Sequence, residues 1–257
     1  MQQLKKWFSS LLVFIVVLVL VGNTKADIKK ILLSEEAEWP PYTYEKSGTP
    51  SKGLSLALMT EIFSRLKIDM DFKLFPQNRC IEQMREGTRD AMTLISKNKE
   101  REKFLEFSEP LVESRGLIYY SSTRKTPFIW DSLSDLKGHR IGIVLGYNYG
   151  DDFIKSREKY ALKVSEVTTL EQNFEKLIVG RIDIMLANQA EASEFIRRNL
   201  EYHEKLKAAD KPYLSYFYHI GFSKKSSARV LLPKINEIIQ QMKAEGILDK
   251  IIAEYLL

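Results

Sequence analysis

The sequence predicts an α/β fold of two similar lobes, each a mostly parallel sheet flanked by helices. Short apolar or alternating runs, which indicate strands, take turns with segments whose apolar residues recur every three to four positions, which indicate helices. Strands that alternate with helices in this way lie parallel, and the alternation runs through the chain twice. With 257 residues, the chain is long enough for two lobes of roughly 100–150 residues each.

The first unit reads strand, helix, strand, helix, strand. Its clearest element is a helix over residues 53–66, in which Leu58 and Ile62 belong to one apolar stripe. A second helix, over 79–86, is expected to end at Gly87, because glycine readily adopts the left-handed conformation that ends helices. The expected strands cover residues 28–33, 69–75 and 90–95.

The second unit repeats this pattern. A helix over 170–179 is expected to end at Gly180 and to start at Thr168 or Thr169, because a threonine hydroxyl can accept a hydrogen bond from a free N–H of the first turn. Strands are expected over 116–121, 140–144, 162–167, 182–187 and 216–222, and further helices over 150–159, 191–199, 231–243 and 248–255.

Two lobes of this kind form a cleft where they face one another. Ligands of open parallel sheets bind outside the carboxyl ends of the strands, so loops from both lobes would line this cleft. Proteins built in this way often close around a ligand by a hinge motion. The fold therefore indicates a ligand site between the lobes.

Residues 1–26 have the three parts of a secretory signal. Lys5 and Lys6 form a basic head, an apolar run of 11 residues extends from 11 to 21, and small residues precede a cleavage point after Ala26. The run is too short for a transmembrane helix, which needs about 20 apolar residues. We therefore expect a cleaved signal peptide at 1–26.

The exported chain is close to neutral and contains one cysteine. Removal of the signal lowers the formal charge from +5 to +2, which argues against nucleic-acid binding, since that would need a basic patch. Cys80 has no partner for an intramolecular disulfide, and no cysteine follows the apolar run to carry a lipid. We expect a free protein of the periplasm, with Cys80 as a small buried apolar residue.

Several short motifs follow one another along nearly the whole exported chain. An aromatic Trp-Pro-Pro loop precedes the first helix, and a Gly-x-x-Asp turn precedes a Lys-Glu-Arg and Phe-Ser-x-Pro block. Each motif is weak by itself, but their order and spacing resemble the family 3 extracellular solute-binding proteins, the polar amino acid receptors of ABC transporters. The matching segments are 38–44, 52–54, 87–90, 99–101, 107–110, 135–138, 141–146 and 180–183.

The resemblance implies a two-lobed clamshell with the type II fold of periplasmic binding proteins. Residues 27–114 and 223–257 would form lobe 1 and residues 115–222 lobe 2, with crossovers near 112–116 and 218–224. The resemblance also implies a monomer that captures a small carboxylate-bearing ligand, an amino acid or a related compound, and presents it to an inner-membrane ABC permease.

The resemblance assigns the ligand's carboxylate to Arg101. A guanidinium group is always charged, and its fork of donors matches two carboxylate oxygens. Ser96 stands where the family offers a hydroxyl to the ligand, and Leu94 stands where many members have a glycine that allows close backbone approach. By its surroundings alone, in the charged run 97–103, Arg101 would instead be a solvated surface residue.

The second lobe is expected to complete the site. The loop 146–150 joins a strand to a helix, so backbone N–H groups around Gly146, Tyr147 and Asn148 are candidates for binding the carboxylate from the opposite side. The alternative is a plain connection between two elements. Thr168 is a further candidate ligand contact from this lobe.

Asn188 is a departure from the family pattern. Amino acid receptors of the family usually have an aspartate here, which pairs with the ligand's ammonium group. An amide accepts a hydrogen bond but cannot supply that charge. Either another acid such as Glu38 serves, or the ligand lacks a free α-amino group.

Aromatic residues and one further arginine are open candidates. Trp39, Tyr42 and Tyr44 either form a wall for the ligand's side chain, since rings stack on cations and planar groups, or pack the lobe interior. Arg79 either reaches the cleft from a strand end or belongs to the first turn of a solvated helix.

Two alternatives to a transport receptor stay open. One is a clamshell enzyme of the cyclohexadienyl dehydratase type with Glu38 as its acid, and the other is a ligand sensor for a membrane signalling partner. The sequence has no recognisable catalytic constellation, cofactor motif or metal-ligand spacing, and His139, His203 and His219 are far apart. It therefore predicts a binding protein without enzymatic activity, cofactor or metal.

Overall fold

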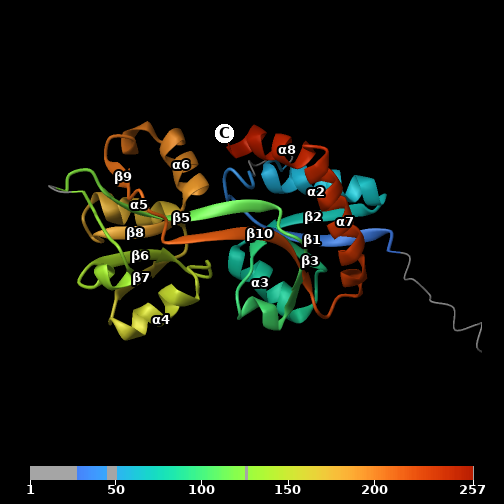
Figure 1. Cartoon of the computed structure of the whole chain (residues 1–257), viewed down its shortest axis with the longest axis horizontal. Coiled ribbons are helices and arrows are strands. Elements are labelled where there is room, and N and C mark those ends of the chain that lie inside the picture. Colours follow the sequence, from blue (N-terminus) through green and yellow to red (C-terminus); the bar gives the residue numbers. More distant parts are fainter. Residues whose placement is uncertain (1–27, 45–50, 125–126, 257) are drawn as a thin grey trace, which may run out of the picture.

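The computed structural model describes residues 28–44, 51–124 and 127–256. The signal peptide predicted for residues 1–26 lies outside this part of the chain. The described residues form two α/β lobes side by side, joined by two long strands, β5 (Val112–Ser121) and β10 (Leu214–Ser223), as Figure 1 shows. The predicted two-lobed α/β fold is confirmed.

Lobe 1 is built on a sheet with a parallel centre and helices on both faces. Its elements are β1 (Lys30–Glu36), α2 (Leu54–Leu66), β2 (Asp69–Phe75), α3 (Gln77–Glu86), β3 (Ala91–Ser96), η1 (Arg101–Lys103), β4 (Leu105–Phe107), η4 (Ser227–Leu231), α7 (Leu232–Ala244) and α8 (Ile247–Leu256). β1 pairs in parallel with β2 on one side and β3 on the other. The carboxyl ends of β1 and β3 therefore lie at the same edge, which faces lobe 2.

Lobe 2 repeats this plan. Its elements are η2 (Leu133–Leu136), β6 (Arg140–Val144), α4 (Asp151–Lys159), β7 (Lys163–Val167), α5 (Leu170–Ile178), β8 (Ile184–Asn188), α6 (Gln189–Arg198), η3 (Leu200–Tyr202) and β9 (Leu206–Ala208). β6 pairs in parallel with β7 and β8, so the ends of β6 and β8 share one edge. This edge faces lobe 1.

The two long strands connect the sheets of both lobes. β5 and β10 pair antiparallel over Val112–Gly116 and Leu214–Tyr218. Beyond this segment, β10 pairs with β3 and β4 of lobe 1, whereas β5 pairs with β8 and β9 of lobe 2. The strand order is β2-β1-β3-β10-β5-β8-β6-β7, so one hydrogen-bonded sheet runs through both lobes.

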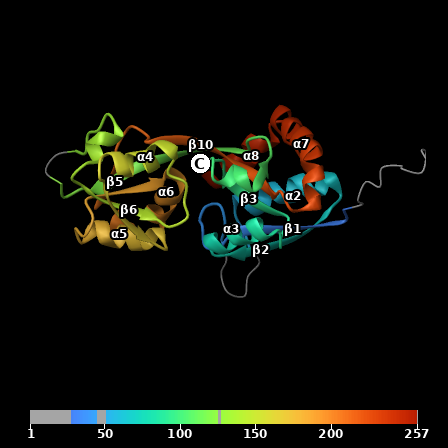
Figure 2. The ribbon, with the colours of Figure 1, turned by 90° about the horizontal axis from the view of Figure 1, so that it is seen from below.

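Each lobe has its own apolar interior. In lobe 1, α2, α7 and α8 pack against one another over one face of the sheet, and Cys80 and Met84 of α3 form a cluster with β3 and β4 residues (Figure 2). In lobe 2, Phe153 of α4 and Phe174 of α5 belong to two separate clusters. The prediction that Cys80 is buried is confirmed, and burial raises the pKa of its thiol.

All helices and strands predicted within the described ranges overlap an observed element of the same type. Thr169 is the N-cap of α5, and its hydroxyl accepts the N–H of Gln172 at 3.4 Å. The strands β4 and β9 were not predicted, because a strand of three residues is too short to show an alternating pattern. Within the described ranges, no helix has the length and apolar character needed to cross a bilayer.

Gly53 fixes the aromatic loop against α2, and we predict that its replacement by alanine is strongly destabilising. It has φ +122°, and an added Cβ would lie 2.3 Å from the backbone carbonyl oxygen of Tyr42. Gly138 has φ +88° with nothing within 4 Å of an added Cβ, so Gly138→Ala is a matched control for backbone strain alone. Gly138→Ala should lower the free energy of unfolding by about 1 kcal/mol, and Gly53→Ala by roughly 2–4 kcal/mol.

Urea unfolding of the two variants beside the wild-type protein measures this difference. Equal losses at both positions would contradict the close contact between Gly53 and the Tyr42 backbone.

Candidate ligand-binding site

The strand ends of the two lobes face one another across a small cavity. Its volume is about 30 Å³, which is room for one or two water molecules, so the lobes are closed on each other. Its walls include Glu36, Trp39, Leu94, Ser96 and Arg101 of lobe 1, Tyr147, Asn148 and Asn188 of lobe 2, and Tyr216 and Tyr218 of β10.

Arg101 is buried although it lies in a charged stretch of sequence. Its side chain is 6% exposed, whereas the adjacent Glu100 and Glu102 are exposed. Nη1 donates to the carbonyl oxygen and the hydroxyl of Ser96 at 2.8 and 2.7 Å, and Nη2 donates to the carbonyl oxygen of Gly146 in lobe 2 at 3.1 Å. The alternative of a solvated Arg101 is therefore wrong.

The charge of Arg101 meets only neutral acceptors. No acidic side chain in the described ranges forms an ion pair with it, and burial lowers its pKa to about 10. A buried cation without a counter-charge is costly in free energy, and an anion placed beside it offsets that cost. The wall formed by Arg101 and Ser96 is thus suited to holding a carboxylate.

The loop after β6 meets lobe 1 at this wall. Gly146 has φ +85°, a conformation that glycine adopts freely, and its carbonyl oxygen accepts from Arg101. Asn148 Nδ2 donates to Ser96 Oγ at 3.2 Å, and Asn148 Oδ1 accepts the N–H of Gly150 at 3.0 Å. The binding of a carboxylate by backbone N–H groups of this loop stays a prediction.

Leu94 keeps a positive φ of +37°, in the range that favours glycine. It is 1% exposed and belongs to the same apolar cluster as Trp39 and Tyr218. Such a backbone costs roughly 1–3 kcal/mol in a residue with a side chain, so the surrounding packing must impose it. The residue lines the cavity, which places a strained backbone at the candidate site.

Two acidic residues outside the predicted set lie at the same interface. Glu36 at the end of β1 and Glu191 in the first turn of α6 both contact Tyr147 Oη, at 2.9 and 3.2 Å. Burial raises the pKa of Glu191 to about 7, and burial together with the charge of Glu191 raises the pKa of Glu36 well above its usual range. The interface therefore carries an acidic group of residues as well as the basic Arg101.

Asn188 is held in a network of neutral hydrogen bonds. Its Oδ1 accepts the Glu191 N–H at 3.1 Å, which caps α6, and also the Tyr42 hydroxyl at 3.4 Å. Its Nδ2 lies 2.6 Å from Ser114 Oγ, 2.9 Å from Tyr218 Oη and 3.0 Å from Tyr216 Oη. The amide thus connects α6, both long strands and the aromatic loop, and it supplies no charge to the cavity.

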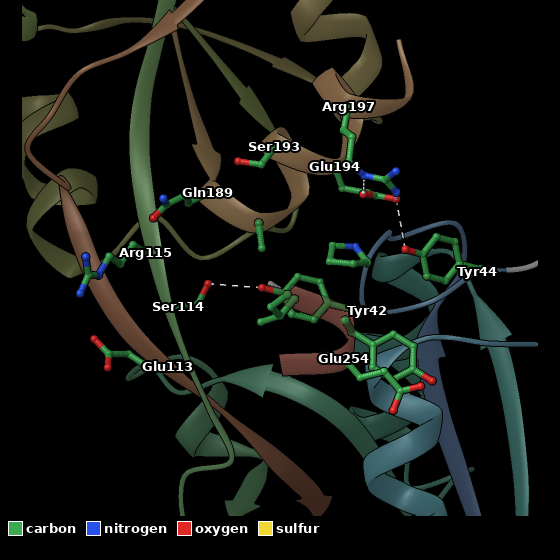
Figure 3. Close-up of a pocket in the computed structure, with 14 residues that line it drawn as sticks. Tyr42, Tyr44, Glu113, Ser114, Arg115, Gln189, Ser193, Glu194, Arg197 and Glu254 are labelled. Atoms are coloured by element: carbon green, nitrogen blue, oxygen red, sulfur yellow. Dashed lines mark hydrogen bonds and ion pairs between the residues drawn. The ribbon is translucent and has the colours of Figure 1, made fainter. Parts of the chain in front are cut away.

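The predicted aromatic residues lie in different places. Trp39 lines the cavity and stacks on Tyr42, with ring centroids 4.1 Å apart, whereas Tyr42 is fully buried behind it. Figure 3 shows Tyr42 and Tyr44 on the wall of a second cavity, of about 790 Å³, beside β5. Tyr44 donates to Glu194 of lobe 2 at 3.2 Å.

Glu38, Thr168 and Arg79 were candidate ligand contacts but lie away from the small cavity. Glu38 and Thr168 are exposed on an outer groove of about 1270 Å³ between the lobes. The Thr168 hydroxyl donates to Gln172 at 3.2 Å. Arg79 is an exposed residue of α3 that lies 3.5 Å from Glu82, so the structure does not bring it to the cavity.

Position along the strands could have revealed Glu36 in the sequence. It stands at the carboxyl end of a parallel strand, the edge at which ligands of such sheets bind. Glu191 carries a weaker signal, since it lies three residues after Asn188 and therefore on the same side of a helix start. That the two acids meet could be learned only from the packing of the lobes.

A two-lobed α/β clamshell whose facing strand ends enclose a buried, uncompensated arginine is the architecture of a solute-binding protein. The chain belongs to the bacterial extracellular solute-binding proteins, family 3, whose sequence model matches residues 31–257. The resemblance inferred from the sequence motifs is therefore confirmed.

Three similar proteins illustrate the relationship. The probable amino-acid-binding protein YxeM of Bacillus subtilis is 20% identical, and the alignment covers 98% of this chain and 96% of that protein. The ABC transporter arginine-binding protein 1 of Escherichia coli is 23% identical over 87% of this chain and 89% of its own. An ancestral arginine-binding protein solved with arginine is 25% identical, with a TM-score of 0.75, over 89% of this chain and 99% of that structure. All three carry the names of binding proteins.

Glu35 is a further acid, fully buried inside lobe 1 next to the half-buried Glu36. Its carboxylate accepts from Ser55 Oγ at 2.6 Å, from Thr93 Oγ1 and from the N–H of Glu36 at 2.7 Å. Burial raises its pKa from 4.5 to about 7, against the lowering effect of these hydrogen bonds. The folded protein thus holds this proton more tightly than the unfolded chain does.

We predict that Glu35→Gln becomes stabilising relative to the wild type as the pH rises. Between about pH 4.5 and 7 the unfolded chain loses this proton while the folded protein retains it, so the wild type loses stability across that window. The amide is neutral throughout, and the gain of the variant over the wild type should grow by up to about 3 kcal/mol between pH 4.5 and 8.

Urea unfolding at several pH values tests this, with Glu158→Gln as the control because Glu158 is exposed on α4. The same pH dependence in both variants would rule out the buried carboxyl of Glu35 as its source.

Proposed function

We propose that this protein is a periplasmic solute-binding protein that captures a small carboxylate-bearing ligand, an amino acid or a related compound, by closure of its lobes. The observation that carries the proposal is Arg101, a buried guanidinium with neutral hydrogen-bond partners from both lobes. A ligand carboxylate would take bonds from Arg101 and Ser96 in lobe 1. The loop 146–150 and Asn188 would complete the site from lobe 2.

The similar proteins support an amino acid as the ligand. The names of two of them refer to arginine, and that of the third to an amino acid. Bound amino acids present a carboxylate together with a cationic group, and the interface carries both Arg101 and acidic residues. This match of charges favours an amino acid over a simple carboxylic acid.

Closure would be a hinge motion at the β5–β10 pair. The segment in which Val112–Gly116 of β5 pairs with Leu214–Tyr218 of β10 is the crossing point between the lobes. On either side of it, each strand belongs to one lobe. The division into residues 27–114 with 223–257 and residues 115–222 stays our prediction. A ligand that contacts both lobes shifts the open–closed equilibrium by its difference in affinity for the two states.

The expected partner is an inner-membrane ABC permease, which would bind the closed form of the protein. We expect the protein to be a monomer. We propose that the protein reaches the periplasm through a cleaved signal at residues 1–26. The alternative of a clamshell dehydratase needs an acid in the cavity. The named candidate Glu38 lies on the outer groove, whereas Glu36 lines the cavity. Turnover of arogenate or prephenate by the purified protein would contradict a purely binding role.

A thermal-shift screen of amino acids, small carboxylates and peptides tests the proposal. A ligand that binds only the native state raises the melting temperature, by mass action, as its concentration increases. We expect stabilisation by amino acids and none by their amides, which lack the carboxylate. Stabilisation by carboxylate-free compounds alone would refute the role of Arg101.

Arg101→Met should weaken binding of the compound found in this screen by at least about 30-fold, because the loss of one partner from a buried charged hydrogen bond costs roughly 2–5 kcal/mol. Methionine keeps a long side chain without the charge. Isothermal titration gives the affinities. Arg79→Met is the matched control and should bind within about twofold of the wild type, since Arg79 is exposed on α3. Equal losses in both variants would disprove the assignment.

A further inference from the structure

One phenol oxygen joins two carboxylates from different lobes. Tyr147 Oη lies 2.9 Å from Glu36 Oε1 of lobe 1 and 3.2 Å from Glu191 Oε1 of lobe 2. A phenol has a single proton, so it can donate fully to only one of these two oxygens. The other contact sets two oxygen lone pairs against each other unless that carboxyl is protonated and donates to the phenol. The geometry therefore calls for one proton shared by Glu36 and Glu191, which we term the acid pair.

The surroundings of the acid pair favour retention of this proton. Glu191 is 7% exposed, and its Oε2 has no hydrogen-bond partner in the described part of the chain. The indole N–H of Trp39 lies near enough to lower the pKa of Glu191 but makes no hydrogen bond. Burial outweighs this effect and raises the pKa to about 7. Two carboxylates this close in a buried site do not both ionise readily.

No cation contacts the acid pair directly. Within the described residues, neither Glu36 nor Glu191 forms an ion pair, and Arg101 acts on Glu36 only at longer range, where it lowers the pKa. The negative charge of Glu35, the preceding residue on the strand, raises the pKa of Glu36 further. Glu36 and Glu191 themselves line the outer groove, and its other charged groups are of both signs, namely Glu38, Lys52, Glu171 and Arg198.

We propose that the acid pair binds the cationic part of the ligand, and that a ligand with one carboxylate and two cationic groups displaces the shared proton. This inference rests on the proposed function, since Arg101 takes the ligand's carboxylate. The charges of the site, one arginine and two ionised acids, then balance those of the ligand, one carboxylate and two cations. The O–H bond of the protonated carboxyl breaks, the proton passes to the solvent, and the ligand's cation takes its place. A ligand with one carboxylate and one cation leaves the proton where it is.

L-arginine and L-citrulline are suitable probes, because they have nearly the same shape and differ by one positive charge. Isothermal titration at pH 6 in two buffers of different protonation enthalpy gives the number of protons released on binding. We expect about one proton for L-arginine and about none for L-citrulline. The affinity for L-arginine should fall by up to about tenfold per pH unit below pH 7, whereas that for L-citrulline should stay constant.

Variants of the acid pair test whether the released proton comes from it. Glu191→Gln should bind L-arginine without releasing a proton, and Glu36→Gln provides the same test should the first variant fail to fold. Glu171→Gln removes an exposed charge from the outer groove and should keep the proton release of the wild type. Proton release that persists in both acid-pair variants would place the proton elsewhere and overturn the inference.

The proposed function and this inference fail in different ways. Binding of both amino acids with equal proton numbers, or of L-arginine with no proton release, overturns the inference and leaves amino acid capture standing. If neither amino acid binds to the wild-type protein, the inference falls, whereas the proposed capture of an amino acid is decided separately by the thermal-shift screen.

Discussion

A buried guanidinium that meets only neutral oxygen atoms is the constraint around which the interface of this protein is arranged. Arg101 donates to two acceptors of Ser96 in its own lobe and to one of Gly146 in the other, so the bond to Gly146 exists only while the lobes are closed. Neutral acceptors satisfy the donors but do not balance the charge. An anion beside Arg101 would offset the cost of this unbalanced charge once the lobes open far enough to admit it, since the closed cavity holds only about 30 Å³.

The fold supplies this constraint through the direction of its strands. Parallel strands end at a common edge in each lobe, and the two edges face one another because β5 and β10 carry the chain across in opposite directions. Residues that end strands, such as Glu36, Ser96 and Asn188, consequently meet although they are distant in sequence. Charge is separated along the interface, with Arg101 near Ser96 and the acids around Tyr147. A dipolar ligand would be oriented by this separation.

The hydrogen-bond network around Asn188 explains why a neutral amide stands at this position. Its amide caps α6 and contacts hydroxyl groups of both long strands, a role that needs a donor as well as an acceptor. An aspartate at this position could accept but not donate. An acid of α6 stands three residues further on, at Glu191, on the same side of the helix start. Through Tyr147 it is connected to Glu36 of the other lobe.

The sequence by itself determined the alternating elements and the burial of Cys80, because periodicity and short motifs are local properties of the chain. It named Arg101 and Ser96 as candidate ligand contacts only through the family resemblance. It could not rank Glu38 against Glu36, since both follow the same strand and only the path of the loop turns one outward and the other into the interface. For the same reason the candidate Thr168 lies outside the cavity, and Arg79 takes the second of its two predicted places, in a solvated helix turn. The meeting of Glu36, Tyr147 and Glu191 was decided by tertiary structure alone, because the distance between side chains from two lobes depends on how the lobes pack.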